Sequence, residues 1–161
     1  YGIDREEKRG NLVDPLPGSF KGDILGFKYN MNDIIATLAS IGVDHYDDAA
    51  NKRRSIGERY RKELSNHQKI KLLKYYEDRK PNYQIFPIHV KNRTRFAKYM
   101  QKHNIMVNIN NRRNDIYPIF GGIMKDLPMT AAADADVILL PIHADLIEDD
   151  VDYIIKVINK Y

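Results

Sequence analysis

Apolar residues recur at three- to four-residue steps in several stretches of the chain, and this spacing predicts amphipathic helices. The first helix is expected to begin at a capping residue, either Asn32 or Asp33, and to be interrupted at Gly42. Further helices are expected over residues 44–65, 93–104, 129–136 and 148–160.

Short runs of β-branched and aromatic residues predict four strands between these helices. They cover residues 70–73, 83–90, 105–109 and 137–141. Because proline cannot donate to a strand ladder, Pro87 in the second run predicts an edge or bulge position. The order of elements predicts an α+β fold with a small, mostly antiparallel sheet covered by helices.

Composition is typical of a globular domain. The chain has 161 residues, of which 43% are hydrophobic and 30% are charged. Cysteine is absent, which excludes a disulfide framework, a cysteine-ligated metal and a thiol nucleophile. The apolar runs are far shorter than the ~18 residues that cross a bilayer, and the charged start does not resemble a signal peptide. We therefore expect an intracellular, cytoplasmic protein without a membrane span.

The net charge of +4 conceals a strongly basic middle segment. Residues 52–113 carry a net charge of +14, whereas residues 1–51 and 114–161 carry −4 and −6. Such a segment suits either an anionic partner, including nucleic acid, or a solvated surface that is paired within the fold. Much of the basic excess falls on the polar faces of two expected helices, which favours the solvated surface.

Two polar segments carry the candidate binding chemistry. Residues 26–33, GFKYNMND, place Lys, Tyr and Asn side chains before a helix N-terminus, where a phosphate or carboxylate can bind. Residues 108–120 are dense in Asn and Arg, which suit a hydroxylated anionic ligand, although both segments also fit polar surface loops. Neither metal-ligand histidine spacing nor a G-x-G-x-x-G or P-loop motif occurs. The acidic run 148–152 suits a helix N-terminus rather than a metal.

These segments, in this order, resemble motifs of the DegT-type (DegT/StrS) sugar-nucleotide aminotransferases, fold-type I enzymes that use pyridoxal phosphate (PLP). Residues 1–5, YGIDR, are similar to the family's G-I-D-R element, and residues 26–33 resemble its G-[FY]-[NK]-[YF]-x-M-[NTS]-D motif. Residues 113–117, RNDIY, resemble an R-N-D loop, and residues 140–143, LPIH, resemble a late L-P-L-H strand. The resemblance spans essentially the whole chain.

The resemblance implies that the chain corresponds to the C-terminal half of such an enzyme. Residues 1–30 would be the end of the large PLP-binding domain and an interdomain loop, and residues 31–161 the small C-terminal domain. The Schiff-base lysine would lie upstream of residue 1, so no catalytic residue is assigned here and the chain alone would be inactive. The implied partners are the missing N-terminal half, a second copy in a homodimer, a nucleotide-sugar and glutamate, with neither nucleic acid nor a membrane.

The resemblance also implies roles for individual residues. Lys28, with Tyr29 and Asn30, would contact the PLP phosphate, and Lys28 is not the Schiff-base lysine. Relatives commonly have Arg or His at the position of Asn30 and His at that of Asn111, so these departures fit an altered sugar specificity. Substrate would be bound by five residues of the second segment: Asn111, Arg113, Asn114, Asp115 and Tyr117.

The implied reaction is transamination, in which a keto group on a nucleotide-linked deoxysugar becomes an amine and glutamate is the donor. Two alternatives stay open at the level of sequence. The chain could belong to a catalytically inactive relative with a structural role, since the decisive lysine lies outside it. It could also be an anion- or nucleic-acid-binding module that uses the basic segment and its tyrosines.

Overall fold

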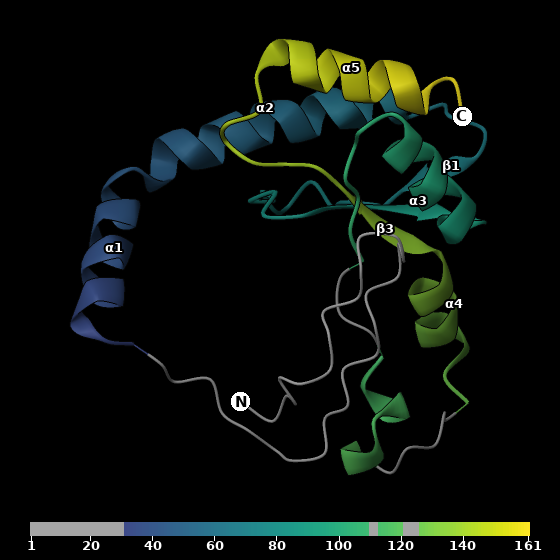
Figure 1. The fold of residues 1–161 in the computed structure, drawn as a ribbon, viewed down its shortest axis with the longest axis horizontal. Helices are drawn as coiled ribbons and strands as arrows, with labels where there is room; N and C mark the ends of the chain where they lie inside the picture. Colours follow the sequence, from purple (N-terminus) through teal and green to yellow (C-terminus); the bar gives the residue numbers. More distant parts are fainter. Residues whose placement is uncertain (1–30, 110–112, 121–125) are drawn as a thin grey trace.

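A computed structural model describes residues 31–109, 113–120 and 126–161 of the chain. The expected α+β class is confirmed, because these parts contain five α-helices and a three-stranded antiparallel sheet in the order β1-β2-β3 (Figure 1). The helices are α1 (Asp33–Asp44), α2 (Tyr46–Leu64), α3 (Arg93–Lys102), α4 (Pro128–Asp136) and α5 (Glu148–Ile158). The strands are β1 (Ile70–Leu72), β2 (Phe86–Val90) and β3 (Val137–Leu140). The stretch 1–30, predicted to end a large domain, lies outside the described residues.

β2 is the central strand, with an antiparallel neighbour on each side. Ile88 lies opposite Leu72 on β1 and opposite Ile138 on β3, while Lys71 lies opposite His89. Alternate residues of β2 are buried, as a strand with one face on the core requires. The sheet therefore has an apolar inner face and a more polar outer face.

The core lies between the inner face of the sheet and the helices α2, α3 and α5. Figure 1 shows α2 and α5 side by side over the sheet, where Arg59 of α2 bonds Asp152 of α5. Tyr60 donates from its hydroxyl to the carbonyl of Pro141 at 3.0 Å. The largest fully buried side chains are Tyr60, Phe86, Phe96, Leu64, Ile88, Met100, Ile138 and Ile158, together with Val90 and Val151. These side chains join the three helices and the sheet in one cluster.

The end of α3 is fixed by a residue in the left-handed conformation. Asn104 has φ 58°, and its N–H donates to the carbonyl of Gln101 at 3.0 Å. The N–H of Ile105 donates to Met100 at 3.0 Å, and the Ile105 side chain is buried. This is the Schellman pattern, in which asparagine takes the place of the more usual glycine. It stops α3 two residues before the predicted end.

The predicted interruption at Gly42 is wrong. α1 runs through Gly42 to Asp44, and the break comes at His45, whose backbone has φ −103° and ψ 5°. Glycine lowers the stability of a helix interior by about 1 kcal/mol relative to alanine, but it does not end a helix unless the backbone needs a positive φ there. The predicted start at Asn32 is confirmed, since its side chain caps α1 by accepting from the N–H of Ile35 at 3.0 Å.

Two of the four predicted strands differ in the structure. The run at 105–109 makes a single bridge between Asn108 and Leu139, and the next N–H, that of Ile109, bonds the Asn108 side chain at 2.8 Å. A side chain that bonds the adjacent backbone competes with a strand ladder. The run at 83–90 becomes a strand from Phe86 onward, because Tyr83 has φ 49° and cannot continue an extended backbone.

Pro87 lies in the central strand rather than in an edge strand, which corrects the prediction. It pairs with Leu139 on β3, whereas β1 ends opposite Ile88 and has no residue beside Pro87. The missing N–H therefore leaves no β1 ladder position unpaired. Pro87 therefore has no neighbour on its β1 side, as at the edge of a sheet, although β2 as a whole is the central strand.

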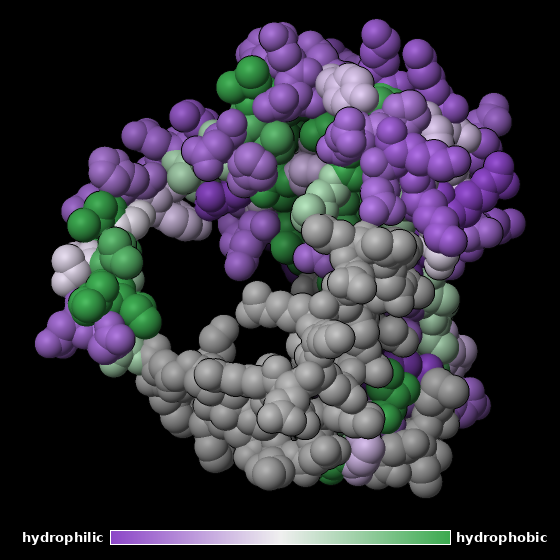
Figure 2. Space-filling model, in the orientation of Figure 1, coloured by the Kyte–Doolittle hydropathy of each residue, from purple (hydrophilic) through white to green (hydrophobic). Residues whose placement is uncertain are grey.

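α1 stands away from the core and keeps its apolar side chains in solvent. It projects from the start of α2 in Figure 1, and Figure 2 shows its apolar side chains as a green patch on the same side of the molecule. Ile34 is 73% exposed and Leu38 is 64% exposed. With Ile35 and Ile41 they recur at helical spacing, so α1 has an amphipathic pattern but buries none of its residues.

Candidate functional site

The predicted substrate segment folds into two consecutive 3-10 turns between the Asn108 bridge and α4. These are η1 (Asn114–Ile116) and η2 (Pro118–Phe120). The N–H of Tyr117 donates to the carbonyl of Asn114 at 3.1 Å, and that of Phe120 donates to Tyr117 at 2.9 Å. The segment is thus internally bonded at each turn.

An ion pair between Arg113 and Asp115 fixes the start of this segment. Nε and Nη2 of Arg113 donate to the two carboxylate oxygens of Asp115 at 2.7 and 2.6 Å. The two side chains are 5% and 12% exposed. Two parallel charge-assisted bonds hold both the distance and the orientation of the two groups, which a single bond does not.

A second carboxylate joins the segment to α4. The backbone N–H of Arg113 reaches the Asp134 side chain at 3.4 Å. The hydrogen bonds to Asp115 raise the pKa of Arg113 and burial opposes them, while the charges of Asp115 and Asp134 add to the increase. Arg113 is therefore cationic at neutral pH.

The structure brings together two of the predicted substrate residues, Arg113 and Asp115, which bind each other. Asn114 between them is exposed, and Tyr117 is half-buried. The other candidates, Asn111 and the predicted PLP contacts Lys28, Tyr29 and Asn30, lie outside the described residues.

Sequence reasoning missed Asp134. It lies in α4, twenty-one positions from Arg113 along the chain. The sequence gives no periodic or motif signal that pairs a helical carboxylate with a distant loop backbone.

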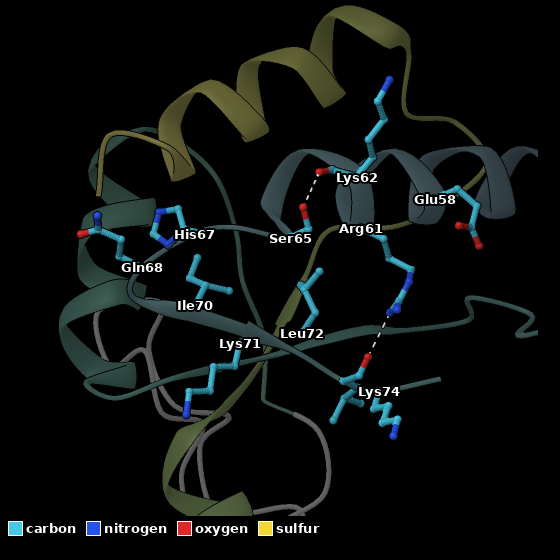
Figure 3. Close-up of a pocket in the computed structure, with 11 residues that line it drawn as sticks. Glu58, Arg61, Lys62, Ser65, His67, Gln68, Ile70, Lys71, Leu72 and Lys74 are labelled. Atoms are coloured by element: carbon cyan, nitrogen blue, oxygen red, sulfur yellow. Dashed lines mark hydrogen bonds between the residues drawn. The ribbon is translucent and has the colours of Figure 1, made fainter. Parts of the chain in front are cut away.

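A separate hollow of about 680 Å³ lies between α2 and β1 (Figure 3). Arg61 donates to the carbonyl of Leu73 at 3.0 Å, and its guanidinium lies 4.5 Å from the centre of the Tyr75 ring. Figure 3 shows Lys62 and Lys71 pointing to opposite sides, away from the hollow. These two lysines therefore do not converge on the hollow.

The described residues contain no group of three or more His, Asp or Glu side chains that could hold a metal ion. Within the same parts of the chain, no helix is long and apolar enough to cross a membrane. The acidic residues Glu148, Asp149 and Asp150 form the first turn of α5, where they face the positive end of the helix dipole.

The described residues form a small antiparallel sheet covered by helices, and residues 113–120, which we call the RND segment, precede α4. Solved structures of sugar aminotransferases share this fold. Residues 9–159 match the DegT/DnrJ/EryC1/StrS aminotransferase family, and the chain belongs to this family. Enzymes of this family use PLP.

One curated relative is the dTDP-3-amino-3,6-dideoxy-alpha-D-galactopyranose transaminase of Aneurinibacillus thermoaerophilus. It is 24% identical over 144 residues, which are 84% of this chain and 38% of the relative. The chain therefore spans about two fifths of the length of this enzyme.

Solved structures of sugar aminotransferases share the fold of this chain, and the chain again covers only part of each of them. The sugar aminotransferase CalS13 from Micromonospora echinospora has a TM-score of 0.77 at 22% identity, over 99% of this chain and 42% of its own. The candidate sugar aminotransferase Spr1654 from Streptococcus pneumoniae, solved in its PLP form, has a TM-score of 0.72 at 22% identity, over 88% of this chain and 38% of its own. The same protein has been solved in its PMP form.

Proposed function

We propose that the protein containing this chain is a PLP-dependent aminotransferase that converts a nucleotide-linked keto-deoxysugar into an amino sugar, with glutamate as donor. Membership of the aminotransferase family and the dTDP-sugar transaminase among its relatives support this proposal. PLP, when bound, withdraws electrons from the reacting carbon and carries the amino group between the two substrates.

The buried Arg113–Asp115 pair is the observation that carries the substrate-binding part of the proposal. It gives the RND segment a fixed backbone, which a substrate site needs if binding is to orient the sugar. In this proposal Asn114, Tyr117 and Asn111 contact the sugar nucleotide. Arg113 and Asp115 contribute to substrate binding by holding the segment in place.

The cofactor site is proposed at the other polar segment. Lys28, with Tyr29 and Asn30, would approach the PLP phosphate, as an ammonium and two hydrogen-bonding groups suit that anion. The lysine that binds PLP covalently would be supplied by the part of the aminotransferase fold that this chain does not span, so the chain alone would be inactive.

The same missing part would cover α1. An apolar helix face in water costs free energy, and such a patch is typical of an interface. The proposed assembly is a cytoplasmic homodimer in which residues 31–161 form the small domain and α1 packs against the large PLP-binding domain.

The test replaces Arg113 by lysine in the full-length protein that carries this chain. Lysine keeps the charge but cannot donate two parallel bonds to Asp115, so the segment should loosen. The two half-reactions of a transaminase can be measured separately. We expect the half-reaction with the keto sugar to slow by about tenfold or more, and the half-reaction with glutamate to keep its rate.

Arg79→Lys is the matched control. Arg79 makes the same two-bond contact, with Asp78 at 2.9 and 2.9 Å, but both side chains are exposed. This variant should leave both half-reactions unchanged. Equal slowing of both half-reactions by Arg113→Lys, or slowing of neither, would contradict the role given to the RND segment.

A further inference from the structure

The outer face of the sheet carries a basic groove that the proposed function does not use. It lies where β1, β2 and the start of α3 meet, and it encloses about 870 Å³. We call it the β1 groove. Its charged lining consists of Lys69, Lys71, Lys74, Lys91 and Arg95, opposed by Asp136.

Strand alternation places the central lysine in this groove. Figure 3 shows Ile70 and Leu72 pointing toward α2 and Lys71 pointing the opposite way. Lys71 lies opposite His89 on β2, and His89 also lines the groove. The sheet backbone therefore fixes the base of the groove, and the cationic side chains extend from a rigid support.

Most of these cations are not neutralised by the fold. Lys69 donates to the backbone oxygen of Tyr161, the last residue of the chain, and lies 5.0 Å from the centre of its ring. Lys74 lies 5.9 Å from the centre of the Tyr76 ring. The ion pairs of the described residues do not include Lys71, Lys91 or Arg95. Like charges gathered in one concave surface repel one another and attract anions, so a bound anion would relieve this repulsion.

The arrangement of the cations favours an anion with more than one phosphate group. Lys71 extends from β1, whereas Lys91 and Arg95 line the same groove from the end of β2 and the first turn of α3. Cations supplied by separate elements around one hollow suit a ligand with more than one phosphate better than a single compact anion. Arg95 adds a planar fork that binds phosphate oxygens in pairs. The volume falls within the range of small-molecule sites, which is roughly 300–1,000 Å³.

We propose that the β1 groove is an anion site for a small molecule that carries two or more linked phosphates. The site is independent of the proposed transaminase chemistry, because it lies on β1, β2 and α3 and shares no residue with the RND segment. If either proposal fails its test, the other proposal is unaffected.

The test titrates the full-length protein that carries this chain, deuterated and isotope-labelled, with inorganic tripolyphosphate at about 50 mM salt and follows the backbone amide NMR signals. We expect saturable shifts at Lys71, His89 and Lys91, and binding about tenfold or more tighter than that of orthophosphate. The double variant Lys71→Gln/Lys91→Gln should weaken binding by about tenfold or more. Glutamine keeps a similar length, and both positions are exposed, so the fold should be retained.

The matched control is Lys52→Gln/Lys156→Gln, which removes the same charge from exposed positions on α2 and α5. It should weaken binding by less than about twofold. Equal weakening by both double variants would show general charge attraction and overturn the proposal. So would absence of saturable binding, or tighter binding of a single-stranded DNA oligonucleotide with shifts over all basic surfaces.

Discussion

Tyr83 is a single residue on which several contacts of the fold depend. Its hydroxyl donates to Glu58 at 2.6 Å, and its ring stacks on Phe86 with centres 6.0 Å apart. Burial raises the pKa of Tyr83, and the hydrogen bond and the negative charge of Glu58 raise it further. Burial likewise raises the pKa of Tyr60, with a smaller increase from Asp150.

These shifts predict that alkaline pH destabilises the fold. A tyrosine whose pKa is higher in the folded state than in the unfolded state contributes stability below the unfolded value of about 10. That contribution is lost as the pH rises toward the folded value. We expect the free energy of unfolding to fall above pH ~10. We also expect absorbance at about 295 nm to show late ionisation of the buried tyrosines, since that signal reports the tyrosinate.

Tyr83→Phe tests this at one residue. Losing the bond to Glu58 should cost about 0.5–1.5 kcal/mol at neutral pH, and the alkaline loss of stability should become shallower. Tyr46→Phe is the control, because Tyr46 is 47% exposed. Urea unfolding at several pH values measures both effects, and an identical pH profile for the two variants would refute the assignment to Tyr83.

The packing of α2 on the segment before β2 depends on a glycine. A Cβ at Gly57 would lie 2.6 Å from the Tyr83 ring, a distance that no ordinary contact allows. The ring is held by Phe86 and Glu58, so it cannot move aside as a flexible side chain would. Close approach of the helix and the ring therefore requires glycine at this position.

A pair of identical substitutions separates packing from helix propensity. Gly57→Ala should destabilise the protein by about 1–3 kcal/mol, because overpacking outweighs the gain of up to about 1 kcal/mol in propensity. In the described part of the chain, a Cβ at Gly42 would meet no atom within 4 Å, so Gly42→Ala should add helix content without loss of stability. Circular dichroism during thermal unfolding measures both. Equal effects of the two substitutions would refute the packing argument.

The elements that sequence predicts well are the long amphipathic helices. α2 and α5 each begin or end within two residues of the predicted bounds, because many periodic positions and a capping or charged end agree. A short strand has few residues whose pattern can be tested. The apolar run at 105–109 therefore has the sequence pattern of a strand, although it makes only a single bridge in the described structure.

The sequence likewise predicts only part of the candidate site. The density of Arg and Asn marked the RND segment, but pairing of Arg113 with Asp115 depends on the local turn, and the contact of Asp134 depends on tertiary placement of α4. The positive φ of Tyr83 also has no local signal, since the preceding and following residues are not glycine or proline.

At the scale of the whole molecule, α1 leaves an apolar face that the described core does not cover. We expect the 161-residue chain to bind a hydrophobic dye and to associate as concentration rises. Leu38→Gln/Ile41→Gln should reduce dye fluorescence several-fold without lowering the unfolding temperature, because both side chains are exposed.

Met106→Gln/Met129→Gln is the matched control. Met106 is 72% exposed and Met129 is 83% exposed, and neither lies on α1. Removing these two side chains should leave dye binding nearly unchanged. A similar loss of fluorescence in both double variants would mean that the dye reports general exposure rather than the α1 face.

β1 is an outer strand of the sheet, paired in the described structure with β2 on one side. An unpaired strand edge is a template on which another extended chain can add, and this is a common start of aggregation. Lys69, Lys71 and Lys74 lie along or beside this three-residue strand. An incoming strand would have to strip water from their ammonium groups and bring its own charges against them. The lysines that line the β1 groove therefore also disfavour edge-to-edge association of the sheet.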